Sequence, residues 1–174
     1  MSAIAPLPAL APWLPAATDE RVAAIVRHAL ARVGVCEMPL GSNRSTLIDE
    51  WARRAGAELG SFWCANFATE VWRVAGVPTA GKGKDPSCDL LMQWAKDTKR
   101  WSSAPTLGAL VFYGPQPTDA THVALVVRLS PATLVVGGNE RWGALASRNG
   151  VAVQLRAEQR SDILGYAHPF ATAA

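Results

Sequence analysis

Residues 109–136 read ALVFYGPQPTDATHVALVVRLSPATLVV, and in this stretch β-rich runs replace the helical periodicity of the chain before it. Gly, Pro, Asp and Ser separate the runs, as is typical of short strands joined by turns. The strands predicted from these and similar runs are 109–113, 122–129, 133–136, 151–155 and 163–167. The second half of the chain is therefore expected to form a sheet.

Four helices are predicted before the sheet. The clearest begins after a cap at Thr18 or Asp19, repeats apolar residues at helical spacing up to Val33, and stops at Gly34. A second follows the loop 40–45, a third begins close to Cys64, and a fourth follows a cap at Ser87. Helices first and strands afterwards predict an α+β fold, with N-terminal helices packed on an antiparallel β-sheet.

Length and composition favour one domain. The chain has 174 residues, 49% of them hydrophobic, which is enough for one sizeable core. Residues 1–17 are interpreted as an extended, Pro-rich N-terminal segment and 18–170 as a single domain. Trp51, Trp72 and Trp94 fall at helical spacing and are expected in the core.

Charge and the N-terminus exclude several classes of protein. The net charge of +3 comes from scattered Lys and Arg, so no nucleic-acid partner is expected. Prolines interrupt the apolar N-terminus, which also has no basic segment, and no apolar run is long enough to cross a membrane. The expectation is synthesis in the cytoplasm without a cleavable signal peptide, and no membrane span.

The cysteine pattern gives no sign of a metal site. Cys36, Cys64 and Cys88 are an odd number without CxxC spacing or paired histidines, which favours neither a disulfide framework nor zinc. No metal or other cofactor is expected. Cys36 and Cys88 are interpreted as buried or half-buried thiols, with a redox role as the alternative.

Three polar residues have positions that suit nucleophilic catalysis. Cys64 stands where a loop enters a helix, and the helix dipole there favours a thiolate. His122 opens a strand after a turn-rich stretch and suits a general base, and Asn139 follows the next strand, where it can orient the imidazole. Each residue considered alone has a structural alternative: Cys64 as a small buried hydrophobe, His122 as a solvent-facing loop histidine, and Asn139 as a turn residue. Glu140 is interpreted as a solvated loop charge, with contact to the site as the alternative.

Six segments together resemble the CHAP branch of the NlpC/P60 cysteine amidases and peptidases. Their most specific pieces are W-C-A-x-F at a helix start, H-V opening a strand, and G-N after the next strand, in that order. The six segments are ALARVGVCEMPLGSNRSTLIDEWARRAG, FWCANFATEVWRVAGVP, PTLGALVFYGP, HVALVV, VVGGN and ILGYAHP.

The resemblance implies a papain-like fold and metal-free thiol chemistry on peptide or amide bonds of bacterial peptidoglycan. Carried over by position, it makes Cys64 the nucleophile, His122 the base and Asn139 the orienting residue. Two departures are the absence of an acidic residue at Gly137 and the Gly108-Ala109 pair where the family often has Gly-Asp.

Aromatic residues that flank these positions are predicted to line a substrate groove, namely Trp63, Tyr113 and Trp142. The backbone N–H of Cys64 is expected to supply part of an oxyanion hole. Asn43 and Ser61 are candidates for the second donor, with helix capping as the alternative role for the segment 42–45.

The expected partner is bacterial peptidoglycan, reached in the periplasm or cell wall by a phage lysin or by an injected antibacterial toxin. Either context implies delivery by other machinery, and the second implies an inhibitory immunity protein. Two alternatives stay open at this point: a catalytically weak or inactive cell-wall-binding module, and an amidase acting on a small cytosolic amide.

Overall fold

Side-chain caps fix where three of the four described helices begin. The computed structural model describes residues 14–15, 18–81, 85–141 and 152–170, and its helices are α1 (Glu20–Leu30), α2 (Thr46–Ala55), α3 (Cys64–Arg73) and α4 (Cys88–Asp97). Asp19 caps α1, Ser45 caps α2 and Ser87 caps α4, each by accepting a hydrogen bond from a backbone N–H of the first turn. The predicted helix starts are confirmed, and Asp19 is the cap of the two alternatives.

The strands form one antiparallel sheet in the order β1-β6-β2-β3-β4-β5. The mixed class predicted from the sequence, helices with an antiparallel sheet, is therefore confirmed. The strand bounds are β1 (Trp101–Ser102), β2 (Leu110–Tyr113), β3 (His122–Arg128), β4 (Leu134–Glu140), β5 (Ala152–Ala157) and β6 (Ile163–Ala167).

Two details of the predicted strands were wrong. The short edge strand β1 was missed, because two residues carry no periodicity. β4 does not stop at Val136 but continues through both glycines to Glu140. Glycine in a strand often marks a close approach of other groups, and that is the case here.

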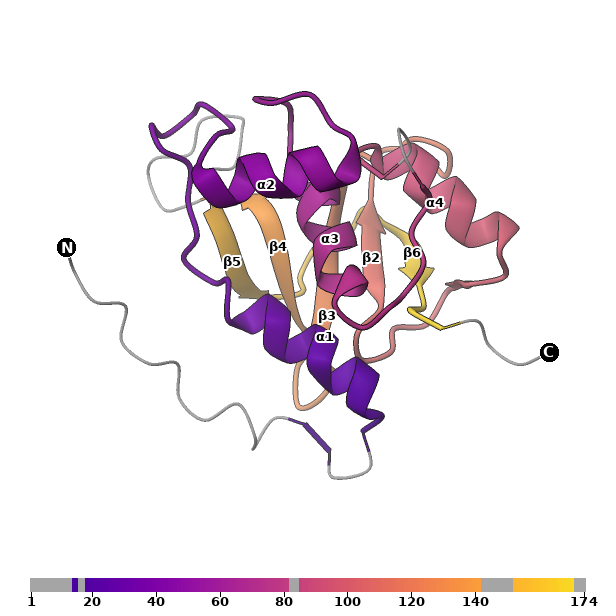
Figure 1. Cartoon of the computed structure of the whole chain (residues 1–174). Helices are drawn as coiled ribbons and strands as arrows, with labels where there is room; N and C mark the ends of the chain where they lie inside the picture. The colour runs from indigo at the N-terminus through magenta and orange to yellow at the C-terminus, as the bar shows by residue number, and fades with distance from the viewer. Residues whose placement is uncertain (1–13, 16–17, 82–84, 142–151, 171–174) are drawn as a thin grey trace.

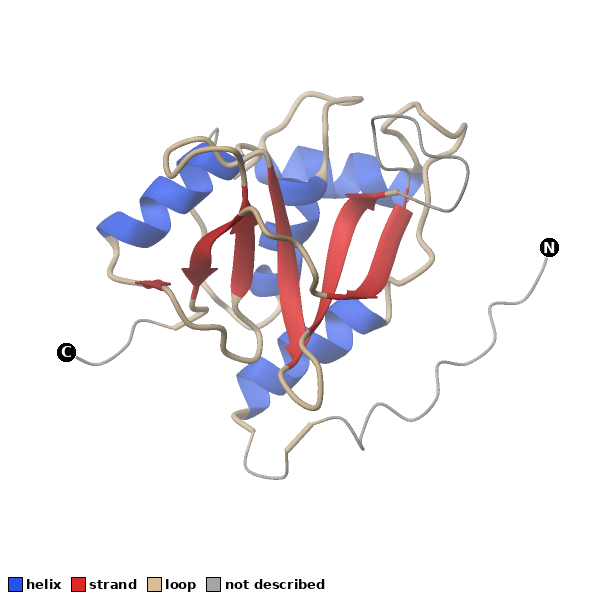
Figure 2. Ribbon diagram, turned by 180° about the vertical axis from the view of Figure 1, so that it is seen from behind, coloured by secondary structure: helices blue, strands red, loops and turns tan. Residues whose placement is uncertain are grey.

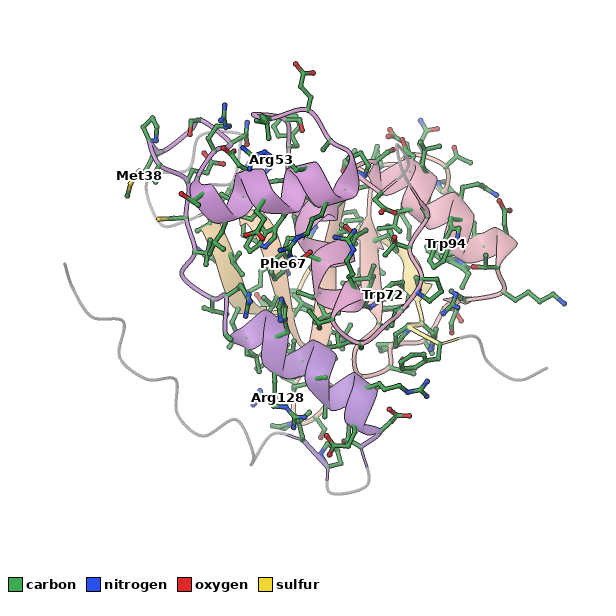
Figure 3. The ribbon with its side chains drawn as sticks, in the orientation of Figure 1. Met38, Arg53, Phe67, Trp72, Trp94 and Arg128 are labelled. Carbon is green, nitrogen blue, oxygen red and sulfur yellow. The ribbon has the colours of Figure 1, made fainter. Side chains whose placement is uncertain are left out.

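The helices cover one face of the sheet (Figure 1). α3 lies against β3 and β4, with α2 packed on α3, and the main core fills the space between. Phe67 and Trp72, labelled on α3 in Figure 3, are fully buried, and the Trp72 ring lies 6.3 Å from that of Trp94 on α4. Trp51 is buried and Trp94 half-buried, as expected for core residues.

No described helix covers the opposite face, which Figure 2 presents to the viewer. A smaller apolar cluster lies there, which includes Val111, Tyr113 and Val126. β5 lies at one edge of the sheet, and β6 lies on the far side of β2, β3 and β4. The chain that joins β5 to β6 crosses the sheet on this face (Figure 2). Glu158 and Arg160 of this crossing segment contact Tyr113, so part of the cluster is covered by charged side chains.

Within the described ranges, the helices are too short or too polar to cross a membrane.

Candidate active site

Among the described helices, α3 is the one whose N-terminus has no side-chain cap. Its N-cap residue is Trp63, which makes no such hydrogen bond, and Cys64 is the first residue of the helix. The first N–H groups of a helix have no partner within it, so they carry partial positive charge next to the thiol. The Cys64 side chain is largely buried, with 6% of its surface exposed.

Cys64 and His122 shift each other's pKa, as a thiolate and imidazolium side by side should. A hydrogen bond from Cys88 and the hydrogen bond and charge of His122 lower the pKa of Cys64 well below that of an ordinary thiol, against the effect of burial. Burial alone would lower the pKa of His122, but hydrogen bonds to Cys64 and Glu140 raise it to about 9. The structure therefore brings together the two residues predicted to react, and the two shifts favour a thiolate beside an imidazolium.

The residue that holds His122 is Glu140, where the sequence interpretation placed Asn139. His122 Nε2 lies 3.0 Å from Glu140 Oε1, and both side chains are mostly buried. Nε2 is thus occupied, which leaves Nδ1 for the thiol. Asn139 has a left-handed backbone, with φ at 56°, and its side-chain oxygen has no hydrogen-bond partner among the described residues. The contact with His122 that was expected of Asn139 is made by Glu140 instead.

A β-bulge explains the exchange. Gly137 pairs with Gln154 while Glu140 pairs with Ala152, so β4 has one more residue than β5 in this interval. Simple alternation would put Gly137 and Asn139 on one face of the sheet, but an extra residue reverses the alternation. Glu140 therefore takes the face that Asn139 would have had.

The two glycines of β4 are required for different reasons. A Cβ atom on Gly137 would overlap the Glu140 carboxylate. A Cβ atom on Gly138 would lie 2.7 Å from Phe67 Cβ and 2.8 Å from the Trp63 ring, on the side of α3. Gly137 thus makes room for Glu140, and Gly138 lets β4 approach the helix that carries Cys64.

Arg156 of β5 holds Glu140 in turn. Its Nε donates to Glu140 Oε1 at 3.1 Å, and its other nitrogens lie 3.4 Å from Glu158 Oε2 and 3.3 Å from the Tyr113 hydroxyl. Burial favours a neutral Glu140, but the His122 and Arg156 side chains keep the pKa of Glu140 below its ordinary value. The carboxylate is therefore charged, and its Oε1 contacts both His122 and Arg156. No pattern in the sequence indicated Arg156.

The aromatic groove predicted from the sequence is not formed by the residues proposed for it. Trp63 is fully buried and donates from Nε1 to Glu37 Oε1 at 2.9 Å. Tyr113 is also fully buried, with its ring stacked on His122 at 5.7 Å between centroids. Both residues support the site from within the core and do not line its surface. Trp142 lies outside the described residues.

Cys88 was interpreted as a buried or half-buried thiol, and the structure places it against Cys64. Cys64 Sγ and Cys88 Sγ lie 3.6 Å apart. The hydrogen bond to Cys64, together with burial, raises the pKa of Cys88 well above the ordinary thiol value. When Cys64 is a thiolate, Cys88 is the donor and Cys64 the acceptor. The contact joins the N-termini of α3 and α4, which lie 24 residues apart and show no shared motif.

The candidates for a second oxyanion donor differ in their surroundings. Ser61 is exposed and donates its hydroxyl to the Glu58 carbonyl. Ser45, not Asn43, caps α2, and the Asn43 side-chain oxygen is buried without a partner in the described part of the chain. Asn66 lies in the first turn of α3, and its side-chain oxygen and nitrogen are also buried without a hydrogen-bond partner in the described part of the chain. Leaving a buried amide without hydrogen bonds is costly, so a bound group that accepts a hydrogen bond would satisfy it. Asn66 is therefore a further candidate for the second oxyanion donor.

No group of His, Cys, Asp and Glu side chains suited to a metal ion occurs in the described ranges. Comparison with family models, with curated proteins and with solved structures gives no match to this chain.

Proposed function

We propose that the chain is a cysteine hydrolase of the CHAP type with a papain-like fold, which cleaves amide bonds in bacterial peptidoglycan. The observation that carries the proposal is the Cys64 thiol at the uncapped N-terminus of α3, beside a His122 imidazole that Glu140 holds through Nε2. The choice of peptidoglycan as substrate rests on the sequence resemblance.

The first half of the reaction forms a thioester. The Cys64 thiolate attacks the carbonyl carbon of the scissile amide, and the resulting oxyanion accepts hydrogen bonds from N–H groups at the start of α3. The His122 imidazolium donates its Nδ1 proton to the leaving nitrogen, the C–N bond breaks, and the amine departs.

The second half releases the acid. A water molecule gives a proton to His122 as its oxygen attacks the thioester carbonyl, and the C–S bond then breaks to regenerate the thiolate and imidazolium. Glu140 stays ionised throughout, because its role is to fix the ring and stabilise its positive charge. The Cys–His–Glu arrangement makes a catalytically inactive wall-binding module the weaker alternative.

Digestion of purified sacculi tests the proposal. Wild-type protein is expected to release soluble fragments whose masses identify the bond cut, whether sugar-to-peptide amide, stem peptide or cross-bridge. Cys64→Ala should release none while melting at nearly the temperature of the wild type. Equal release by both proteins would contradict the nucleophile assignment. Hydrolysis of small amides without release from sacculi would instead favour the small-amide amidase.

A further inference from the structure

Cys88 is a buried nucleophilic group that the proposed hydrolysis does not use. It is the first residue of α4, its side chain is 9% exposed, and its sulfur lies 3.6 Å from that of Cys64. The third cysteine, Cys36, lies elsewhere, in a β-bridge with Ala152 at the start of β5. Two adjacent thiols at two helix N-termini form an arrangement with chemistry of its own.

We propose that Cys64 and Cys88 are a reversible oxidation site, in which a hydroperoxide oxidises Cys64 and Cys88 then closes a Cys64–Cys88 disulfide. The disulfide removes the thiolate from the active site until a thiol reductant restores it. Its formation does not require hydrolytic activity, whereas its effect on hydrolysis rests on the function proposed above.

The chemistry balances with hydrogen peroxide as the oxidant. The Cys64 thiolate attacks one peroxide oxygen, the O–O bond breaks, and the departing hydroxide takes the His122 proton and leaves as water. Cys64 is then a sulfenic acid. The Cys88 sulfur attacks the Cys64 sulfur, the S–O bond breaks, and hydroxide leaves with the Cys88 proton as a second water. Two thiols have lost two electrons, and one peroxide has gained them.

The first step itself makes Cys88 reactive. While Cys64 is a thiolate, its hydrogen bond and charge keep Cys88 protonated. Sulfenic acid carries no such charge, so this cause of the raised pKa disappears once Cys64 is oxidised. The position of Cys88 at the start of α4 then favours its thiolate, against the effects of burial and of the Asp89 charge.

The distance is short enough for closure within the fold. A disulfide needs about 2.05 Å between the sulfurs, so the two must approach by roughly 1.5 Å. Rotation about the side-chain bonds of one or both cysteines supplies a movement of this size. Without a neighbouring thiol, a sulfenic acid is open to further and irreversible oxidation.

Peptide mapping of the peroxide-treated full chain tests the site directly. After oxidation, alkylation of remaining thiols and tryptic digestion, peptides 55–73 and 85–96, which contain Cys64 and Cys88, are expected to be joined. Peptide 33–44, which contains Cys36, should be alkylated and separate. Dithiothreitol should separate the joined peptides and restore release of fragments from sacculi. This mapping uses wild-type protein, so it does not depend on the folding of a variant.

Two variants sharpen the outcome. In the Cys88→Ser variant, peroxide should oxidise Cys64 to the sulfinic acid, because no thiol is present to close a disulfide. The Cys64 peptide should then be heavier by two oxygen atoms, and dithiothreitol should not reverse the change. Cys36→Ser should behave as wild type. Accumulation of sulfinic acid at Cys64 in wild type without joined peptides would overturn the proposal, and so would joining through Cys36. Joined peptides in a protein that never acts on sacculi would leave the oxidation site standing and remove the proposed function instead.

Discussion

The Glu140 carboxylate occupies space that a side chain on Gly137 would fill. The absence of a side chain at Gly137 therefore lets the Glu140 carboxylate lie in this position. The sequence resemblance leads one to expect an acidic residue at position 137. This chain places a carboxylate against His122 from three residues further along, through the bulge that includes Asn139. The missing acid at Gly137 is therefore no sign of a weakened site.

Gly137→Ala should lower kcat by roughly tenfold or more, because the added methyl group displaces Glu140 from His122. Gly137→Glu should lower kcat as well, because its side chain would also overlap Glu140. The measurement is the rate of fragment release from sacculi, with the melting temperature as a check on folding.

A double-mutant cycle separates this effect from general strain. If Gly137→Ala acts by displacing Glu140, the double variant Gly137→Ala/Glu140→Gln should be no slower than Glu140→Gln alone. Fully additive losses would mean that the methyl group acts through another contact.

Glu140→Gln should slow turnover by roughly 10- to 1,000-fold, since a neutral amide stabilises the imidazolium less than a carboxylate does. Asn139→Gly is the matched control. Glycine tolerates the left-handed backbone at this position, so the substitution removes only the amide side chain. Its rate should stay within about threefold of wild type, which is at most about 0.7 kcal/mol in activation free energy. An equal loss in both variants would return the orienting role to Asn139.

The pH profile of kcat/KM should be bell-shaped. Protonation of the Cys64 thiolate stops the reaction at low pH, below the ordinary thiol range, and loss of the His122 proton slows it as pH rises through about 9. Glu140→Gln should move the basic limb to lower pH, because the carboxylate raises the pKa of His122. A basic limb that stays in place would show that Glu140 does not act on the imidazole.

The elements of the fold other than β1 were predictable, because each has a local signal. Caps at Asp19 and Ser87, helical spacing of apolar residues and β-rich runs fixed four helices and five strands to within a few residues. The pairing of the His122 strand with the strand before Asn139 was also expected and is present.

What failed depended on contacts between distant residues. Asn139 was expected near His122 from its position after a predicted strand and from the resemblance. Only the pairing of β4 with β5 reveals the extra residue that brings Glu140 to His122 instead. Trp63 precedes the nucleophile and seemed fit for a groove, but its partner is Glu37, 26 residues away in a buried position. The contact between Cys64 and Cys88 also joins residues that are distant in the sequence, because it depends on how α3 and α4 pack together.

Cys88→Ala should slow iodoacetamide labelling of Cys64 at mildly acidic pH, because the thiol hydrogen bond that stabilises the thiolate is lost. In the wild type, Cys64 should be labelled faster than Cys36 or Cys88. Cys88→Ser keeps a donor at this position and should retain most of the labelling rate, which distinguishes loss of a hydrogen bond from loss of packing. The measurement is the pH dependence of labelling, followed by peptide mapping. If the alanine and serine variants both match wild type, Cys88 does not tune the nucleophile, and the lowered pKa of Cys64 comes from His122 and the start of α3.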